Sequence, residues 1–414
     1  MTDMAGAVPV IAVDKVQAVA LAVCTYYFGV WLKGKVGVLS RYSIPSPVVG
    51  GMSFAIVVSF LEYFNIVKVQ IDSTLQTVLM LGFFTTIGLM ASLRVVKDGG
   101  RLLLGFLLAV TVLVFLQNGM GMGIAEAMGF DKHYGILAGS VSMMGGLGTA
   151  AAFGPYFEET YGITGGTAVA VTAATFGMVA ALLIGGPFGE WCIRRYKVKT
   201  PDEVQQPEPE LHLPDDMDTD ITEQHASAKP NFTNEIMRAV SVTALAMGLG
   251  TIVSNFLGHY ITLPAYIGAM IIATIIRNVG DFSGMYKVEG KGLNAVADIT
   301  LVLFVTMAIN NLKLHELVHL ALPLVVILAC QTILMLIYAW TVLFTAFGRS
   351  YDAVMLSVGG IGFSMGATAN GLANMQAISE KYGSSPRAWL IVSVVGAFLI
   401  DLINAVVITW FGTL

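Results

Sequence analysis

The sequence predicts an all-α integral membrane protein made of two inverted-topology repeats, each with five transmembrane helices and one re-entrant hairpin. Three observations lead to this fold class. The chain of 414 residues is 56% hydrophobic and only 12% charged, with a mean hydropathy of +0.76, whereas soluble proteins carry about 25% charged residues. Long apolar segments recur along its whole length. Two stretches rich in Gly, Ser, Thr and Asn interrupt these segments at corresponding places in the two halves.

Each transmembrane helix is predicted from an apolar segment, because a helix needs about 20 such residues to cross the hydrocarbon core of a bilayer. Each half of the chain supplies five segments. In chain order they cover residues 16–32, 47–64, 74–93, 102–128 and 164–193, and then 236–257, 264–276, 293–312, 320–347 and 388–411.

A polar linker divides the chain into its two repeats. Residues 199–233 are acidic, rich in proline and free of long apolar runs, which is typical of a solvated connection. The N-terminal repeat then covers residues 1–198, with its hairpin at about 134–158. The C-terminal repeat covers residues 234–414, with its hairpin at about 351–383.

Basic residues predict the orientation, because cytoplasmic loops are enriched in Lys and Arg. We place the N-terminus outside and let each Gly-rich stretch enter and leave on the same side. Of the 22 lysines and arginines, only Lys15, Lys68, Lys132 and Lys313 then lie outside. A single crossing by either stretch would move every later loop to the other side and destroy this bias. Both stretches are therefore predicted to be re-entrant, with both termini periplasmic and the linker cytoplasmic.

The two halves share short matches that lie about 220 residues apart. IPSPVVGGM at 44–52 matches LPAYIGAM at 263–270, and Phe84 with its neighbours matches the surroundings of Phe304. Five spans per half is an odd number, so the two halves face opposite ways. Such inverted repeats are typical of secondary transporters.

The Gly-rich stretches predict where the binding site lies. Irregular backbone at membrane depth is tolerated only where it is buried in protein or lines an aqueous cavity. The first stretch is expected to turn at residues 145–149, and the second at 359–362 and again at 366–370. The alternative explanation of such stretches is close helix packing through small residues.

An anion site is predicted where the two turns meet. Thr149, Thr368 and Asn370 are suitable N-caps for the helices that follow, and helix N-termini attract carboxylates. Two opposed turns suit a substrate with two carboxylates. The predicted substrate-binding residues are Gly145, Gly146, Gly148, Thr149, Gly366, Thr368, Asn370 and Asp401.

Asp401 is the most informative charged residue, because it lies well inside the last apolar segment. A charge at that depth is costly and usually functional. It is predicted to meet a substrate ammonium, a sodium ion or a proton, the alternative being a salt bridge or a cap inside the bundle. Neutral side-chain oxygens of the kind that sodium takes accompany it. The predicted ion-binding residues are Ser142, Ser364, Asn374, Asp401 and Asn404.

The sequence does not indicate an enzyme. Residues 362–366 match the pattern G-x-S-x-G, but that motif requires a strand-to-helix elbow and a histidine partner. The three cysteines and six histidines have the spacing of neither a disulfide framework nor a transition-metal site. Sodium is the only metal expected. Membrane lipid is the expected surrounding of the protein, and no nucleic acid is expected as a partner.

Four motifs extend over most of the chain: GGLGTAAAFG at 145–154, GFSMGATANGLANM at 362–375, EKYGSSPRAW at 380–389 and VGAFLIDLINA at 395–405. In order and spacing they resemble the glutamate:sodium symporter family of bacteria. The resemblance implies sodium-coupled symport of L-glutamate across the inner membrane, without a cofactor beyond Na⁺ as the coupling ion. It also implies a homodimer and an elevator-like movement of a hairpin-bearing transport domain against a scaffold.

Two positions depart from the family pattern. Leu147 stands where the family usually has His, and Ala369 stands where it commonly has Pro. Both lie in the predicted site, so the selectivity among glutamate analogues stays open. The alternatives are a sodium- or proton-coupled di- or tricarboxylate carrier on the same architecture and, less favoured, a channel, since inverted repeats with hairpins also build pores.

Overall fold

The computed structural model describes most of the chain and shows an almost entirely helical protein. The described residues are 8–37, 39, 44–94, 100–201, 232–257, 265–284, 286, 290–314 and 319–414. The predicted linker at 199–233 therefore lies largely outside the described residues. Among the described helices, seven are long and apolar enough to cross a membrane.

The helices follow the predicted apolar segments closely. In the first half they are α1 (Lys15–Lys35), α3 (Ser46–Tyr63), α4 (Thr74–Met90), α6 (Gly100–Ala127) and α9 (Gly166–Tyr196). In the second half they are α10 (Phe232–Leu257), α11 (Ala265–Ser283), α12 (Lys291–Asn310), α13 (Ala321–Tyr338) with the π-helical η4 (Ala339–Ala346), and α16 (Pro386–Val394) with the π-helical η5 (Val395–Leu399) and α17 (Ile400–Gly412).

Local signals in the sequence determine where several helices begin. Asp14 caps α1 by accepting hydrogen bonds from the backbone N–H of Val16 and Gln17 at 2.8 and 2.9 Å. Gln17 Oε1 accepts the N–H of Asp14 in return, which completes a capping box. Ser350 caps α14 (Tyr351–Met365) and Ser385 caps α16, each by accepting a backbone N–H three residues on. The residues at which these helices begin can therefore be predicted from the sequence.

Each Gly-rich stretch forms two short helices joined by a tip. Hairpin one consists of α7 (Lys132–Ile136), the π-helical η1 (Leu137–Val141) and α8 (Gly146–Tyr161). Hairpin two consists of α14 (Tyr351–Met365) and α15 (Thr368–Tyr382). We call residues 142–149 tip one and residues 364–370 tip two.

The predicted turn at residues 359–362 is wrong, because this segment lies inside α14. The glycines are needed there for packing rather than for a turn. A Cβ atom added at Gly362 would lie 2.3 Å from the Cα atom of Gly371 on α15. The two arms of hairpin two therefore contact each other backbone to backbone, and this contact offsets the low helix propensity of glycine.

A short parallel β-sheet was not predicted. Strand β1 (Val10–Val13) pairs with β2 (Lys68–Ile71), with Val10 opposite Lys68 and Val13 opposite Ile71. Both strands are rich in β-branched residues, which favour extended backbone. The sheet ties the N-terminal segment to the connection between α3 and α4.

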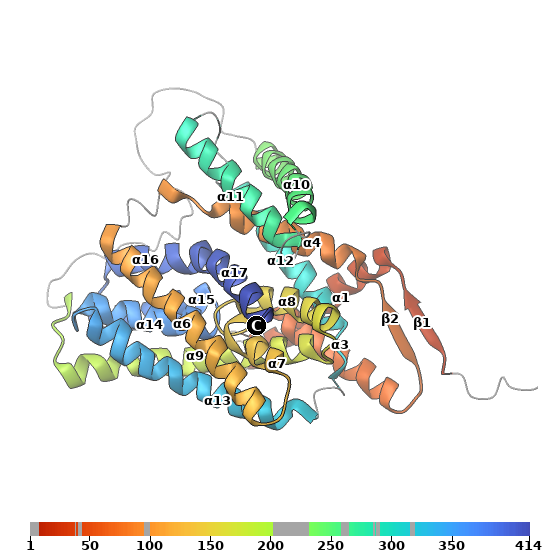
Figure 1. Ribbon diagram of the computed structural model, residues 1–414, viewed down its shortest axis with the longest axis horizontal. Helices are drawn as coiled ribbons and strands as arrows, with labels where there is room; N and C mark the ends of the chain where they lie inside the picture. Colours follow the sequence, from red (N-terminus) through yellow and green to blue (C-terminus); the bar gives the residue numbers. More distant parts are fainter. Residues whose placement is uncertain are drawn as a thin grey trace, which may run out of the picture.

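The described helices pack in two groups (Figure 1). The first group, which we call the frame, contains α1, α3, α4, α10, α11 and α12. The second group, the hairpin bundle, contains α6 to α9 and α13 to α17. Contacts between the groups are few and run mainly from α12 to α8 and from α4 to η5 and α17. Each half of the chain thus contributes three helices to the frame and one hairpin to the bundle.

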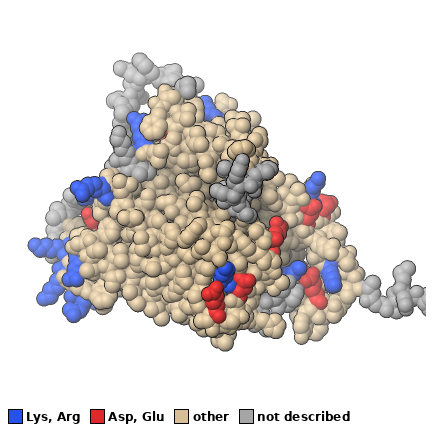
Figure 2. Space-filling model, viewed as in Figure 1, with Lys and Arg blue, Asp and Glu red and all other residues tan. Residues whose placement is uncertain are grey.

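The surface has the charge distribution of a membrane protein. Figure 2 shows that charged side chains are sparse over most of the middle of one face and gather toward its margins. Many large apolar side chains are exposed, among them Phe28, Phe60, Leu108 and Ile252. Surfaces of this kind are stable against lipid and unstable in water.

Candidate functional site

The two tips touch. Gly146 has a positive φ of 61°, and a Cβ atom added to it would lie 2.6 Å from the carbonyl oxygen of Gly366. Glycine adopts this conformation without the penalty that other residues incur. Segments more than 200 residues apart in the sequence therefore meet in the interior of the protein.

Two helices have their N-termini at this contact. The N-cap residues are Gly145 for α8 and Ala367 for α15, and neither helix has a side-chain cap. The prediction that Thr149, Thr368 and Asn370 cap these helices is wrong. Each N-terminus carries about half a positive charge, and its backbone N–H groups are left to a partner other than a capping side chain.

The predicted capping side chains instead hold the tips in place. Thr368 Oγ1 donates a hydrogen bond to the carbonyl oxygen of Gly396 in η5 at 2.5 Å. Asn370 Nδ2 donates to the carbonyl oxygen of Met178 in α9 at 2.9 Å. Thr149 lies in the first turns of α8 and covers Gly145. Tip two is thus fastened to both η5 and α9.

Asp401 lies on α17, between two residues that bind the hairpins. Earlier on the same continuous helix, Gly396 binds Thr368 of tip two. One turn after Asp401, Asn404 Nδ2 donates to the carbonyl oxygen of Ser140, which lies just before tip one, at 3.1 Å. Asp401 is partly exposed, and its carboxylate forms no hydrogen bond or ion pair with the other described residues. The carboxylate is therefore available at the level of the tips.

The frame supplies the wall that faces tip one. A Cβ atom added at Gly148 would lie 2.9 Å from the ring of Phe83 on α4 and 3.4 Å from Leu301 Cδ1 on α12. Phe83 in turn packs on Phe304, with ring centroids 5.5 Å apart. The tips therefore lie where the hairpin bundle meets helices α4 and α12 of the frame.

The predicted ion-binding residues are not all equivalent in the structure. Ser142 Oγ donates to the carbonyl oxygens of Leu137 and Ala170 at 2.5 and 2.7 Å. Asn374 Nδ2 donates to the carbonyl oxygen of Ala181 at 3.0 Å, almost two turns from the start of α15 and away from tip two. Both side chains are engaged in packing hairpins against α9.

Sequence reasoning missed a buried amide cluster on α6. Gln117 Nε2 donates to the carbonyl oxygen of Ser364 at 2.9 Å, and Asn118 Oδ1 accepts the N–H of Ser140 at 2.9 Å. Gln331 on α13 donates to the carbonyl oxygen of Gln117 at 2.7 Å. The signal was present, because two adjacent amides in the interior of a 28-residue apolar helix are unusual.

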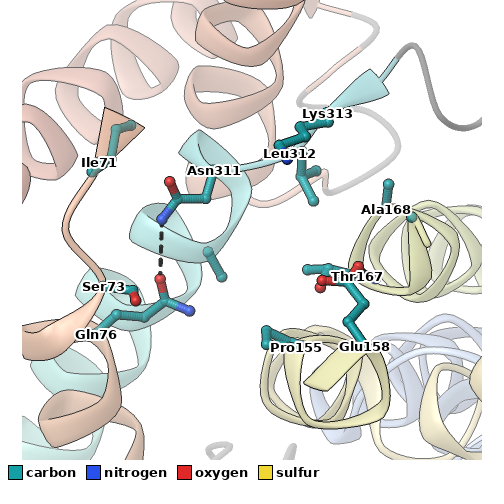
Figure 3. A pocket seen from close by; sticks show the side chains of 12 residues that line it. Ile71, Ser73, Gln76, Pro155, Glu158, Thr167, Ala168, Asn311, Leu312 and Lys313 are labelled. Carbon is teal, nitrogen blue, oxygen red and sulfur yellow. Dashed lines mark hydrogen bonds between the residues drawn. The ribbon is translucent and has the colours of Figure 1, made fainter. Parts of the chain in front are cut away.

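A cavity of about 250 Å³ lies between the frame and the hairpin bundle (Figure 3). Gln76 and Asn311 line its frame side and are joined by a long hydrogen bond of 3.5 Å. Glu158 and Thr167 line the opposite side, and Lys313 lies at one edge. Gln76 lies two helical turns before Phe83, the α4 residue that faces tip one. Two turns span about 10 Å, so the cavity lies about that far from tip one.

Comparison with known proteins identifies the family. The family model described as sodium/glutamate symporter matches residues 11–384. The sodium/glutamate symporter of Escherichia coli is 38% identical over 400 residues, which cover 95% of this chain and 96% of that protein. The chain belongs to the sodium/glutamate symporter family. The symporter of Haemophilus influenzae is 35% identical over 395 residues, with 94% of this chain and 95% of that protein covered.

Membership in the sodium/glutamate symporter family confirms the resemblance drawn from the four sequence motifs. It also confirms that the chain is a transporter and not an enzyme. Together with the long apolar helices, it makes the chain a multi-pass membrane protein with bacterial relatives.

Proposed function

We propose that this chain is a sodium-driven symporter of L-glutamate, and that the substrate binds at the contact between the two tips. The observation that carries the proposal is the approach of Gly146 to Gly366 in the interior. It brings the uncapped N-termini of α8 and α15 together. Asp401, which is partly exposed, lies on the neighbouring helix between the residues that bind Thr368 of tip two and Ser140 before tip one. A zwitterionic dicarboxylate has the complementary groups.

Each group of the substrate has a partner in this proposal. The two carboxylates bind backbone N–H groups at the N-termini of α8 and α15, where the helix dipoles favour negative charge. The α-ammonium binds Asp401. Sodium favours the conformation that accepts glutamate, and linkage requires glutamate to favour sodium binding by the same factor. The cavity beside Lys313 provides the route from the periplasmic side.

Transport by purified protein tests the function directly. In proteoliposomes with an inward tenfold sodium gradient, we expect radiolabelled glutamate to accumulate above its equilibrium level. Such a gradient supplies about 1.4 kcal/mol per ion, enough for about tenfold accumulation per coupled sodium ion. Potassium in place of sodium is the control. Absence of sodium-driven accumulation would contradict the proposal, and stronger competition by unlabelled citrate or malate than by glutamate would assign another substrate.

The inverted repeats and the topology are also proposals. Their main support is a pair of corresponding contacts within the frame. Added Cβ atoms at Gly51 on α3 and Gly88 on α4 would lie 2.7 Å from Ile309 of α12 and 2.3 Å from the carbonyl oxygen of Met270 on α11, respectively. Positions 51 and 270, and positions 88 and 309, are each about 220 residues apart, as expected for two-fold related repeats.

Cysteine accessibility tests the topology. Lys313 and Arg195 are both exposed, and the topology places them on opposite sides of the membrane. In a background without native cysteines, we expect Lys313→Cys to react with a membrane-impermeant maleimide in intact cells. Arg195→Cys should react only after permeabilisation. The reverse pattern would overturn this orientation, because both termini would then be cytoplasmic and the linker periplasmic.

Elevator movement and dimerisation complete the proposal. The small contact between frame and hairpin bundle suits a bundle that slides as a body against a fixed frame. The frame exposes apolar residues on α1, α3 and α10, which offers a surface for a second copy. Light scattering in detergent would give twice the monomer mass for a dimer, and a monomer mass would reject this part.

A further inference from the structure

Four buried side-chain oxygens beside the tips have no hydrogen-bond partner among the described residues. They are Gln117 Oε1, Ser140 Oγ, Ser364 Oγ and Asn404 Oδ1. Each of these residues is at most 1% exposed. Buried polar atoms are almost always paired, so four unpaired oxygens in one region require an explanation.

Hydrogen bonds from the same residues bring the four oxygens into one region. The Gln117 amide binds the backbone of Ser364, and the Asn404 amide binds the backbone of Ser140. Asn118, the neighbour of Gln117, binds Ser140 as well. In Gln117 and Asn404 the amide nitrogen donates the hydrogen bond and orients the side chain, whereas in Asn118 the amide oxygen accepts one. The oxygens therefore belong to a preorganised junction of α6, η1, α14 and α17.

The electrostatics of this junction favour a cation. The first arms of both hairpins end here, η1 at Val141 and α14 at Met365. Helix C-termini carry about half a negative charge, whereas the substrate carboxylates are assigned to the N-termini of the second arms. Hydroxyl and amide oxygens are the ligands that hard cations prefer.

We propose that Gln117 Oε1, Ser140 Oγ, Ser364 Oγ and Asn404 Oδ1 form a sodium site at the junction of α6, η1, α14 and α17. The inference rests on the proposed function and names the ion site within it. It sets aside Ser142 and Asn374, whose donor groups serve packing. It also leaves Asp401, one turn before Asn404, to the substrate ammonium.

Two alanine variants test the site cleanly. Because Ser140 Oγ and Ser364 Oγ make no hydrogen bond to the described residues, Ser140→Ala and Ser364→Ala remove a ligand and no such bond. We expect the sodium concentration for half-maximal glutamate uptake to rise about tenfold or more in each. The matched control is Ser357→Ala, two turns earlier on α14, whose hydroxyl donates to the carbonyl oxygen of Ala353 at 2.7 Å. It should stay within about twofold of wild type.

Sodium binding without glutamate provides a second measurement. Ligands that bind the folded state raise the Tm, so NaCl should raise the Tm of purified wild type above that in equimolar KCl. Both variants should need about tenfold more sodium for the same increase. If an alanine variant does not fold, the cysteine variant at that position carries the test. A thiol has a volume similar to that of the serine hydroxyl, but its sulfur binds sodium poorly.

The outcomes separate this inference from the proposed function. Sodium-driven glutamate uptake in wild type, together with unchanged sodium dependence in Ser140→Ala and Ser364→Ala, would overturn the site alone and leave water as the partner of these oxygens. Sodium stabilisation that is lost in the variants, without glutamate uptake by wild type, would support the site and reject the function. If sodium affects neither uptake nor Tm in wild type, both are wrong.

Discussion

Gly146→Val is expected to abolish glutamate uptake. A Cβ atom at this position would meet the carbonyl oxygen of Gly366 at 2.6 Å, which is far inside van der Waals contact. The positive φ of Gly146 adds strain of about 1–2 kcal/mol for any other residue. The variant must separate the tips or distort the start of α8, and either change removes the proposed carboxylate site. Gly146→Ala should lose at least about tenfold in initial uptake rate, since 1.4 kcal/mol corresponds to a factor of ten.

The control for this experiment is Gly186→Ala on α9. An added Cβ atom there meets nothing within 4 Å, and alanine favours helix over glycine. We expect wild-type uptake and expression. Wild-type uptake by Gly146→Val, at equal protein in the membrane, would mean that the contact between the tips is dispensable for transport.

Asp401→Asn is expected to reduce glutamate uptake by at least about 100-fold. The amide has nearly the same shape as the carboxylate but cannot neutralise the substrate ammonium. With glutamate bound over it, Asp401 would form a buried ion pair with the ammonium; removing one member of such a pair costs about 3–5 kcal/mol, and the lower limit already exceeds a factor of 100. Initial rates in proteoliposomes at saturating sodium measure this loss.

Sodium binding distinguishes two of the roles that the sequence left open for Asp401, namely binding of the substrate ammonium and binding of sodium. If Asp401 binds the ammonium, Asp401→Asn should keep the sodium-dependent rise in Tm within about threefold of the wild-type sodium concentration. Loss of that rise would move Asp401 into the sodium site. Asp298→Asn on α12 is the matched control for the change of charge, because Asp298 is exposed on the frame and should transport normally.

The shape of hairpin two shows the limit of local sequence reasoning. Glycine composition predicted a turn at residues 359–362, yet α14 is continuous there. The reason is the contact of Gly362 with Gly371 on the opposite arm, because close backbone packing compensates for low helix propensity. The turn at Gly366 and Ala367, which has no such compensation, was predicted correctly.

The candidate site shows the same limit. Gly146, Gly366 and Thr368 were selected from the sequence; the structure brings Gly146 to Gly366 and binds Thr368 to Gly396, five residues before Asp401. Gln117 was missed, because its partner Ser364 is 247 residues away. The capping roles were misassigned for a similar reason: Thr368 and Asn370 satisfy carbonyl oxygens on η5 and α9, which helix-start statistics do not take into account.

The sequence by itself determined the membrane class, the order of the apolar helices, the position of both tips and the family. These properties depend on composition, hydropathy and motifs, which act locally or within one segment. Only the tertiary structure decided which residues of the tips touch, which oxygens stay unpaired, and how the helices divide between the frame and the hairpin bundle. Those features arise from packing between segments about 200 residues apart, where shape complementarity decides the contact and residue type alone does not.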